Sequence, residues 1–233
     1  MRVLVFDSSA IISIITNNLL EILTELKKHY HGEFYITNKV KEEIVDGPLR
    51  SRRFRLEALQ LAHYIADKYI KIYEHNLEEK TNYLLTLANT IFIAKDNYIS
   101  ILQKGEVETL ALAALIEAQA VVVDERTTRL LIEDPLKLKK LLENKLHTKV
   151  KLDKHNLNYF KKETKNIKVI RSSELMIMAF ELGLFKEYEH SKLLIKDNFK
   201  RYLLEGILWG LRLKGCAIST EEINQALRIE KIR

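Results

Sequence analysis

Two short apolar segments, each ended by an aspartate, constrain the fold more than any other feature of this sequence. Residues 3–6 (Val-Leu-Val-Phe) run into Asp7, and residues 120–123 (Ala-Val-Val-Val) run into Asp124. Short runs of bulky and β-branched residues bounded by polar ones are typical of strands buried on both faces of a parallel sheet. Ligands of such sheets bind at the carboxyl ends of the strands. Both carboxylates are therefore expected at the edge where an α/β protein performs its chemistry.

The rest of the sequence alternates predicted helices with further strands at 33–37 and 167–170. This alternation predicts a three-layer α/β/α sandwich around a central parallel sheet, with extra helices at the C-terminus. The helices are expected over 8–15, 19–30, 39–45, 54–73, 76–94, 106–119, 125–133, 172–184 and 193–213, and a last one follows the capping pair Ser219 and Glu222. We expect no strand between the helical patterns 54–73 and 76–94.

Composition excludes several classes of protein. The hydrophobic share of 47% and the charged share of 30% indicate a globular chain. A single cysteine, Cys216, leaves no intrachain disulfide and argues against a thiolate zinc site. The glycine-rich phosphate loops of NTPases and dinucleotide enzymes are absent. No signal peptide and no membrane-spanning stretch is recognised, so we expect a cytoplasmic protein without a membrane partner. Few Gly and Pro among many charged helix formers suggest a thermophilic source.

The positive charge is concentrated in one segment. The chain carries a net charge of +6, whereas residues 136–168 alone hold eleven lysines against three acidic residues. One interpretation is a solvated lysine-rich face, as in heat-adapted proteins. The other is a surface that follows the phosphates of a nucleic acid. The sequence does not decide between them.

Acidic residues follow the predicted strands or begin the helices next to them. They are Asp7, Glu43, Glu106, Glu108, Asp124 and Glu125. Any one of them could be a helix cap or could offset a helix dipole. Together they supply the carboxylate oxygens that Mg²⁺ and Mn²⁺ prefer. Such a cluster could hold metal ions that activate water against a phosphodiester.

Four sequence blocks resemble PIN-domain nucleases of archaea and bacteria, and they occur in that family's order. The blocks are VLVFDSSAII (3–12), YITNKVKEEI (35–44), KGEVETLALA (104–113) and VVVDERTTR (121–129). The resemblance implies an α/β/α sandwich with a Mg²⁺- or Mn²⁺-dependent ribonuclease site directed at single-stranded RNA.

The resemblance also implies roles for individual residues. The catalytic acids would be Asp7, Glu43, Glu106 and Asp124, and the metal ligands Asp7, Glu106, Asp124 and Glu125, with Glu125 sharing or taking the fourth role. The family's spacing of an acid to later alanines favours Glu106 over Glu108. On the substrate side, Ser8 or Ser9 would support the first acid, and Arg129 would contact a phosphate.

The resemblance leaves parts of the chain unexplained. We expect a domain over 1–184 with helical insertions near 50–95 and 136–165, followed by a helical extension over 185–233. RNA is the expected partner, and a homodimer or an antitoxin-type protein partner would also suit such a domain. Two alternatives stay open, a PIN fold that binds RNA or assembles without turnover and a receiver-like signalling domain. The latter lacks its lysine after the later strand, where Arg171 and Ser172 stand.

Overall fold

A parallel sheet forms the centre of the molecule, as the sequence predicts, but it has five strands instead of the four expected. The structure is a computed structural model that describes residues 2–195 and 197–230. The strand order is β3-β2-β1-β6-β8 and every pairing is parallel. The strands are β1 (Val3–Phe6), β2 (Glu33–Thr37), β3 (Lys71–Tyr73), β6 (Ala120–Val122) and β8 (Val169–Ile170). Because β1 pairs with both β2 and β6, the residues that follow these three strands lie at one edge.

The apolar run of β1 exists because this strand is buried on both faces. Val3 and Val5 belong to the core on one side of the sheet, and Leu4 and Phe6 belong to the core on the other. All four side chains are buried. Successive side chains of a strand point to opposite faces, so a strand between two helical layers needs apolar residues at every position.

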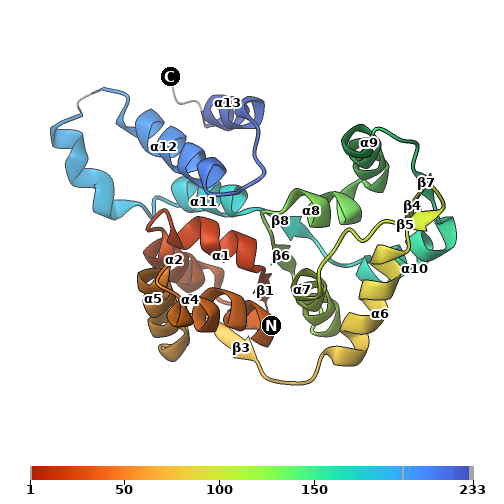
Figure 1. The fold of residues 1–233 in the computed structure, drawn as a ribbon. Coiled ribbons are helices and arrows are strands. Elements are labelled where there is room, and N and C mark those ends of the chain that lie inside the picture. Colours follow the sequence, from red (N-terminus) through yellow and green to blue (C-terminus); the bar gives the residue numbers. More distant parts are fainter. Residues whose placement is uncertain (1, 196, 231–233) are drawn as a thin grey trace.

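Helices from both ends of the chain cover the first face of the sheet. They are α1 (Ser8–Ile15), α2 (Leu20–Tyr30), α5 (Arg55–Ala66), α11 (Ser172–Glu181), α12 (Phe199–Leu213) and α13 (Thr220–Ile229). In Figure 1, α11 and α12 lie beside α1. Leu208 of α12 and Ile223 of α13 are buried in the same core as Ile11 of α1. The division into a domain over 1–184 and an extension over 185–233 stays a prediction. Residue 1 of that domain and residues 196 and 231–233 of that extension lie outside the described residues.

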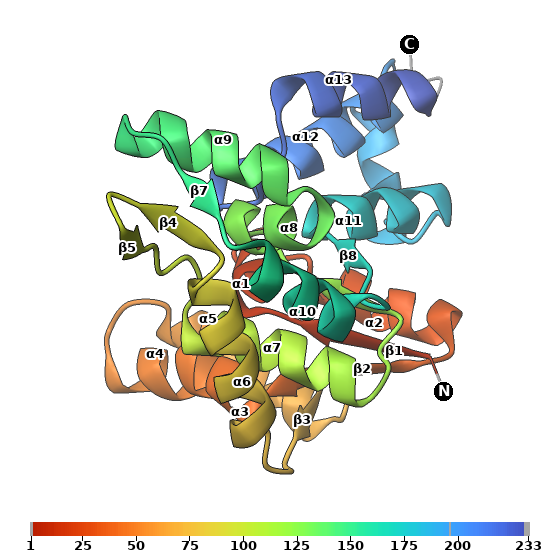
Figure 2. The same cartoon turned by 90° about the vertical axis from the view of Figure 1, so that its right-hand side faces the viewer.

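Helices from the middle of the chain cover the second face. They are α6 (Glu78–Asn89), α7 (Lys104–Leu115), α8 (Arg126–Glu133), α9 (Pro135–Leu146) and α10 (Lys154–Thr164). Figure 2 shows α7 and α10 in front of the sheet. The two helical layers confirm the three-layer sandwich with extra C-terminal helices.

Short elements complete the chain. Between β2 and α5 the helical path is divided into α3 (Asn38–Lys41), the π-helical turn η1 (Glu42–Asp46) and α4 (Gly47–Arg50). A small antiparallel sheet joins β5 (Asn97–Tyr98), β4 (Phe92–Ala94) and β7 (Lys151–Leu152). The 3₁₀ helix η2 (Lys186–Leu193) precedes α12.

Three predicted helices overrun the observed ones by five residues or more, and the helix expected over 106–119 ends at Leu115. The pattern 54–73 ends as a helix at Ala66, and Lys68 adopts a left-handed φ of 61° before the edge strand β3, which contradicts the expectation of no strand in this region. The pattern 76–94 ends at Asn89, whose side chain accepts hydrogen bonds from the backbone of Ile101 and Leu102. Residues 92–94 then form β4. The predicted helix 193–213 begins only at Phe199. In the first two cases partners distant in sequence override the local helical periodicity.

Within the described residues, no single helix is long and apolar enough to cross a membrane. Only the bent pair α1 and α2 passes that test together, by length and composition, with an angle of 118° between them.

Candidate metal-binding and nuclease site

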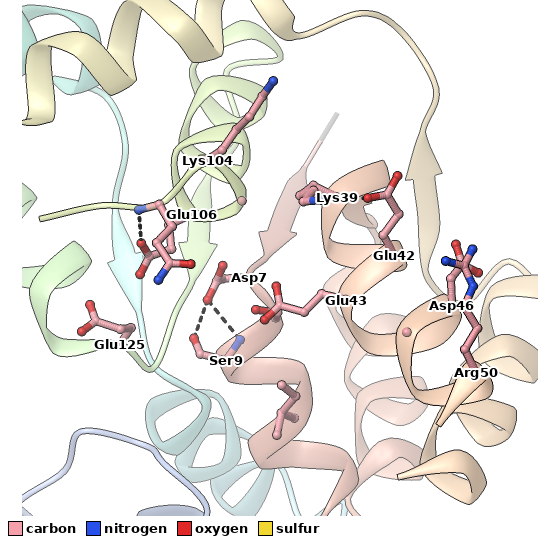
Figure 3. Close-up of a pocket in the computed structure, with 15 residues that line it drawn as sticks. Asp7, Ser9, Lys39, Glu42, Glu43, Asp46, Arg50, Lys104, Glu106 and Glu125 are labelled. Atoms are coloured by element: carbon pink, nitrogen blue, oxygen red, sulfur yellow. Dashed lines mark hydrogen bonds and ion pairs between the residues drawn. The ribbon is translucent and has the colours of Figure 1, made fainter. Parts of the chain in front are cut away.

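A cavity of about 910 Å³ opens where β1, β2 and β6 end. Four separate segments line it. They are Asp7 to Ser9 and Ile12 after β1, residues of α3, η1 and α4 between Lys39 and Arg50, residues 103–106 at the start of α7, and Glu125 after β6. Figure 3 shows their acidic side chains gathered around the end of β1. Parallel pairing of the three strands explains why residues so far apart in sequence meet here.

Asp7 lies at the base of this cavity and caps helix α1. Its side chain is 3% exposed. One carboxylate oxygen, Oδ2, accepts hydrogen bonds from the backbone N–H of Ser9 at 3.0 Å and from the Ser9 hydroxyl. The Ser9 hydroxyl oxygen in turn accepts from the backbone N–H of Asp124 at 3.1 Å. Burial raises the pKa of Asp7, the negative charge of Glu43 adds to the rise, and the Ser9 hydrogen bonds oppose it.

Glu106 enters the cavity from the first turn of α7. It forms a capping box with Gln103, whose backbone N–H donates to Glu106 Oε2 at 2.7 Å. The hydroxyl of Thr128 donates to its other oxygen at 3.3 Å. Burial raises the pKa of Glu106 to about 7, and the charges of Glu125 and Asp7 contribute to the rise. Glu106 thus holds a proton more tightly than an ordinary glutamate, because burial and neighbouring negative charge disfavour its ionised form.

Glu43 faces Asp7 from the opposite wall. It is exposed and lies in the π-helical turn η1, and Figure 3 shows its carboxylate directed toward Asp7. The neighbouring Glu42 points away and pairs with Lys39 at 2.9 Å. Gly105 of α7 lies against this wall, where a Cβ atom would be in ordinary contact with Glu43 Oε2 at 3.9 Å. Local π-helical turns are frequent at functional sites, because the extra residue redirects side chains.

The two acids after β6 have different surroundings. Glu125 lines the cavity and caps α8, where its Oε2 accepts from the backbone N–H of Thr128 at 2.7 Å. Asp124 is 1% exposed, and both of its oxygens are bound to Ser172, at 2.8 Å from the backbone N–H and 2.6 Å from the hydroxyl. Asp124 does not line the cavity. The role of fourth ligand that we expected for Asp124 therefore falls to Glu125 in the proposal below.

The remaining predicted residues are placed as follows. Ser8 and Ser9 both line the cavity. Arg129 does not, and its guanidinium pairs with Glu133 at 3.2 Å. Glu108 also lies outside the cavity lining, and it accepts from the backbone N–H of Lys39 at 3.4 Å.

Sequence reasoning missed the part of the cavity wall that is not acidic, and it missed two acids, Glu42 and Asp46. Gln103 is positioned by its capping box with Glu106, a spacing that is visible in the sequence. Lys39, Asp46, Arg50 and Lys104 also line the cavity. The sequence holds no local sign of their convergence, because they come from separate helices.

The donor set suits a hard divalent cation. All the acids that line the cavity offer carboxylate oxygens, and two of them, Asp7 and Glu106, have raised pKa values. Two basic side chains of the α3 wall are already paired, Lys39 with Glu42 and Lys41 with Asp46. Uncompensated negative charge thus remains at the centre of the cavity. Among the described residues, no three His, Cys, Asp or Glu side chains stand close enough to hold an ion as they are arranged, so these carboxylates would have to move closer together to bind one.

Comparison with known proteins agrees with the fold. A family model described as PIN domain matches residues 3–134, which is more than half of the chain. No curated protein and no solved structure gives a significant match. PIN domains are generally nucleases that use divalent metal ions. On the family match and on the parallel sheet with its acidic edge, the chain belongs to the PIN-domain family.

Proposed function

We propose that this protein is a divalent-metal-dependent endoribonuclease that hydrolyses phosphodiester bonds of single-stranded RNA. The observation that carries the proposal is the convergence of Asp7, Glu43, Glu106 and Glu125 on one cavity, from four segments that the sheet brings together. Their carboxylates would hold Mg²⁺ or Mn²⁺. The bound metal would activate water and neutralise the charge that develops on the phosphate.

The residues of this chain have distinct tasks in that proposal. Ser9 holds Asp7 in place through two hydrogen bonds to one oxygen, which leaves the other oxygen, Oδ1, for a cation. Glu106 would hold the cation in its ionised form, which the positive charge would favour against the burial and neighbouring negative charge that raise its pKa to about 7. The backbone N–H of Asp124 donates to the Ser9 hydroxyl that holds Asp7, and the Asp124 side chain joins β6 to α11 through Ser172.

The depth of the site favours a flexible substrate. Asp7 is almost fully buried at the end of β1, so the scissile phosphate must enter the cavity to reach it. A single strand can bend its backbone inward, whereas a duplex holds its phosphates on a stiff cylinder. Single-stranded RNA is therefore the proposed substrate.

The test is cleavage of a labelled single-stranded RNA with Mn²⁺, with EDTA, and with the variants Asp7→Asn and Glu106→Gln. The matched control is Glu108→Gln, which removes a glutamate from the same helix turn but outside the cavity. We expect cleavage by the wild type and by Glu108→Gln only with Mn²⁺, and at least a hundredfold loss in the other two variants. Full cleavage by Asp7→Asn would refute the proposal.

A PIN fold that binds RNA without cutting it is the second candidate. It is favoured by the side-chain arrangement, in which each cavity acid except Glu43 is engaged by a protein donor. RNA binding by the wild type without cleavage in Mn²⁺ would support it. The receiver-like alternative is not retained, because the chain belongs to the PIN-domain family and the residue after β8 is Arg171, which pairs with Glu174 and Glu222.

A further inference from the structure

An arginine-rich segment stands at the rim of the acidic cavity. Residues 50–55, here called the arginine loop, read Arg-Ser-Arg-Arg-Phe-Arg and connect α4 to α5. All six residues are exposed. Arg50 also lines the cavity, where Figure 3 shows it beyond Glu43 on the α4 side. The loop is thus continuous with the wall of the proposed active site.

The charge of the arginine loop is not neutralised by the protein. Among the described residues, no acidic side chain forms an ion pair with any of its four arginines, whereas Lys39 and Lys41 on the same wall are both paired. An exposed cluster of guanidinium groups free of acidic partners is suited to phosphate groups, which arginine binds through its fork of donors.

The loop also presents an aromatic ring in an unusual conformation. Phe54 is 43% exposed and has a left-handed φ of 60°, which is uncommon for a bulky residue. The guanidinium of Arg53 lies over its ring at 4.7 Å from the centroid. An exposed ring beside cationic groups is the combination with which proteins stack the bases of single-stranded nucleic acids.

Hydrogen bonds within the loop hold this arrangement. The backbone oxygen of Ser51 accepts from Arg55 Nε at 2.9 Å, and the Ser51 hydroxyl donates to the oxygen of Arg53 at 3.0 Å. The loop is therefore shaped before a ligand arrives, which lowers the entropy lost on binding.

We propose that the arginine loop is the docking site of the single-stranded RNA substrate, with Arg52 and Arg53 on its phosphates and Phe54 stacked on one of its bases. This proposal rests on the proposed function for its substrate. The acids in the cavity repel a phosphate chain, so a separate cationic surface at the rim is needed to hold the strand. Arg50 connects that surface to the cavity, where one phosphodiester reaches the metal ligands.

The lysine-rich segment 136–168 is the rival surface. Its lysines are spread over α9, β7, α10 and the segments around them. Some are already paired, Lys139 with Glu143 and Lys151 with Asp96. In Figures 1 and 2, α10 lies away from α4, where the arginine loop begins. Lys161 and Lys162 of α10 are exposed and offer a control with the same change of charge.

The experiment measures binding of a 5′-fluorescein-labelled uridine dodecamer by fluorescence anisotropy, in EDTA so that no cleavage occurs. The variants are Arg52→Gln/Arg53→Gln, Phe54→Ala and Phe54→Tyr, with Lys161→Gln/Lys162→Gln as control. We expect the arginine pair to weaken binding at least tenfold and to reduce the slope of log K against log salt by roughly 1.4, at about 0.7 per phosphate. We expect Phe54→Ala to weaken binding at least about fivefold and Phe54→Tyr to retain it.

The outcome is independent of the nuclease test. If the wild type binds RNA through this loop but never cleaves it, the docking proposal stands and the nuclease proposal fails. If cleavage occurs but binding is unchanged in the arginine variant, or falls equally in the lysine control, the docking proposal is overturned. In that case the exposed Phe54, Leu56 and Leu59 would be left as a surface for a protein partner.

Discussion

The substitutions Asp7→Asn and Asp124→Asn should have different effects on the stability of the protein. Both aspartates follow a central strand and both are buried, but their surroundings differ. Asp124 accepts two hydrogen bonds from Ser172 and connects β6 to α11, whereas burial and Glu43 raise the pKa of Asp7.

The expected size follows from these contacts. A hydrogen bond to a charged group contributes about 1.5–3 kcal/mol, roughly twice the value for a neutral pair. Asparagine at position 124 can keep both contacts to Ser172 only as neutral ones, so we expect a loss of about 2 kcal/mol. For a chain of this length, that loss lowers Tm by about 4–8 °C. Asparagine at position 7 removes a charge that is costly to bury, so Tm should be unchanged or higher in EDTA.

The assay is thermal unfolding in EDTA and then in Mn²⁺. Mn²⁺ at about 100 times its Kd stabilises the native state by about 2.7 kcal/mol, so Tm of the wild type should rise by about 5–10 °C. We expect Asp124→Asn to keep this rise and Asp7→Asn to lose it. Ser172→Ala is the matched control, because it removes one of the two hydrogen bonds to Asp124 at a distance from the cavity.

One result would refute this reasoning. The result would be a Tm of Asp124→Asn equal to that of the wild type in EDTA, together with no increase in its Tm on addition of Mn²⁺. Asp124 would then be a metal ligand, and its contacts to Ser172 would not stabilise the fold. The original expectation from the family resemblance would then hold in place of the geometric assignment.

Three further predictions concern pH, Ser9 and the C-terminal helices. Because the pKa of Glu106 is raised to about 7 in the folded state, the native state holds that proton more tightly than the unfolded state. Stability in EDTA should therefore fall as pH rises from about 4.5 through 7, and Glu106→Gln should flatten the pH dependence of Tm. Ser9→Ala removes the hydroxyl between Asp7 and the backbone of Asp124, so RNA cleavage should fall at least tenfold while a urea titration shows a loss of about 1–3 kcal/mol. Leu208→Ala should cost about 2–5 kcal/mol in the same titration, since Leu208 is buried in the core of α1 and α11, and a separate transition for residues 185–233 would contradict that.

Much of the core fold could be predicted because its signals are local. The runs at 3–6 and 120–123 are apolar at every position since β1 and β6 lie between two helical layers. Strands at the margins were harder to recognise. Residues 71–73 and 92–94 form β3 and β4 only because β2 and β7 offer them hydrogen-bonding partners. Their own sequences continue a helical periodicity.

The candidate site divides in the same way. The resemblance of four sequence blocks to PIN-domain nucleases was enough to indicate Asp7, Glu43 and Glu106. They meet because residues after parallel strands and at the starts of the adjoining helices lie at one edge. Asp124 and Glu125 are neighbours in sequence, and no local pattern distinguishes them. Ser172 begins α11, 48 residues further along the chain, and donates hydrogen bonds to Asp124. Asp124 is therefore held by α11, whereas Glu125 lines the cavity.

The sequence by itself therefore determined the layered α/β class and the acidic edge, since both arise from short-range patterns of apolar and charged residues. Only the tertiary structure decided which acid after β6 faces the cavity, which basic residues are already paired and which stay free at its rim. Those properties depend on contacts between segments far apart in the chain. The arginine loop shows this difference, because its composition is visible in the sequence while its place beside the acids is not.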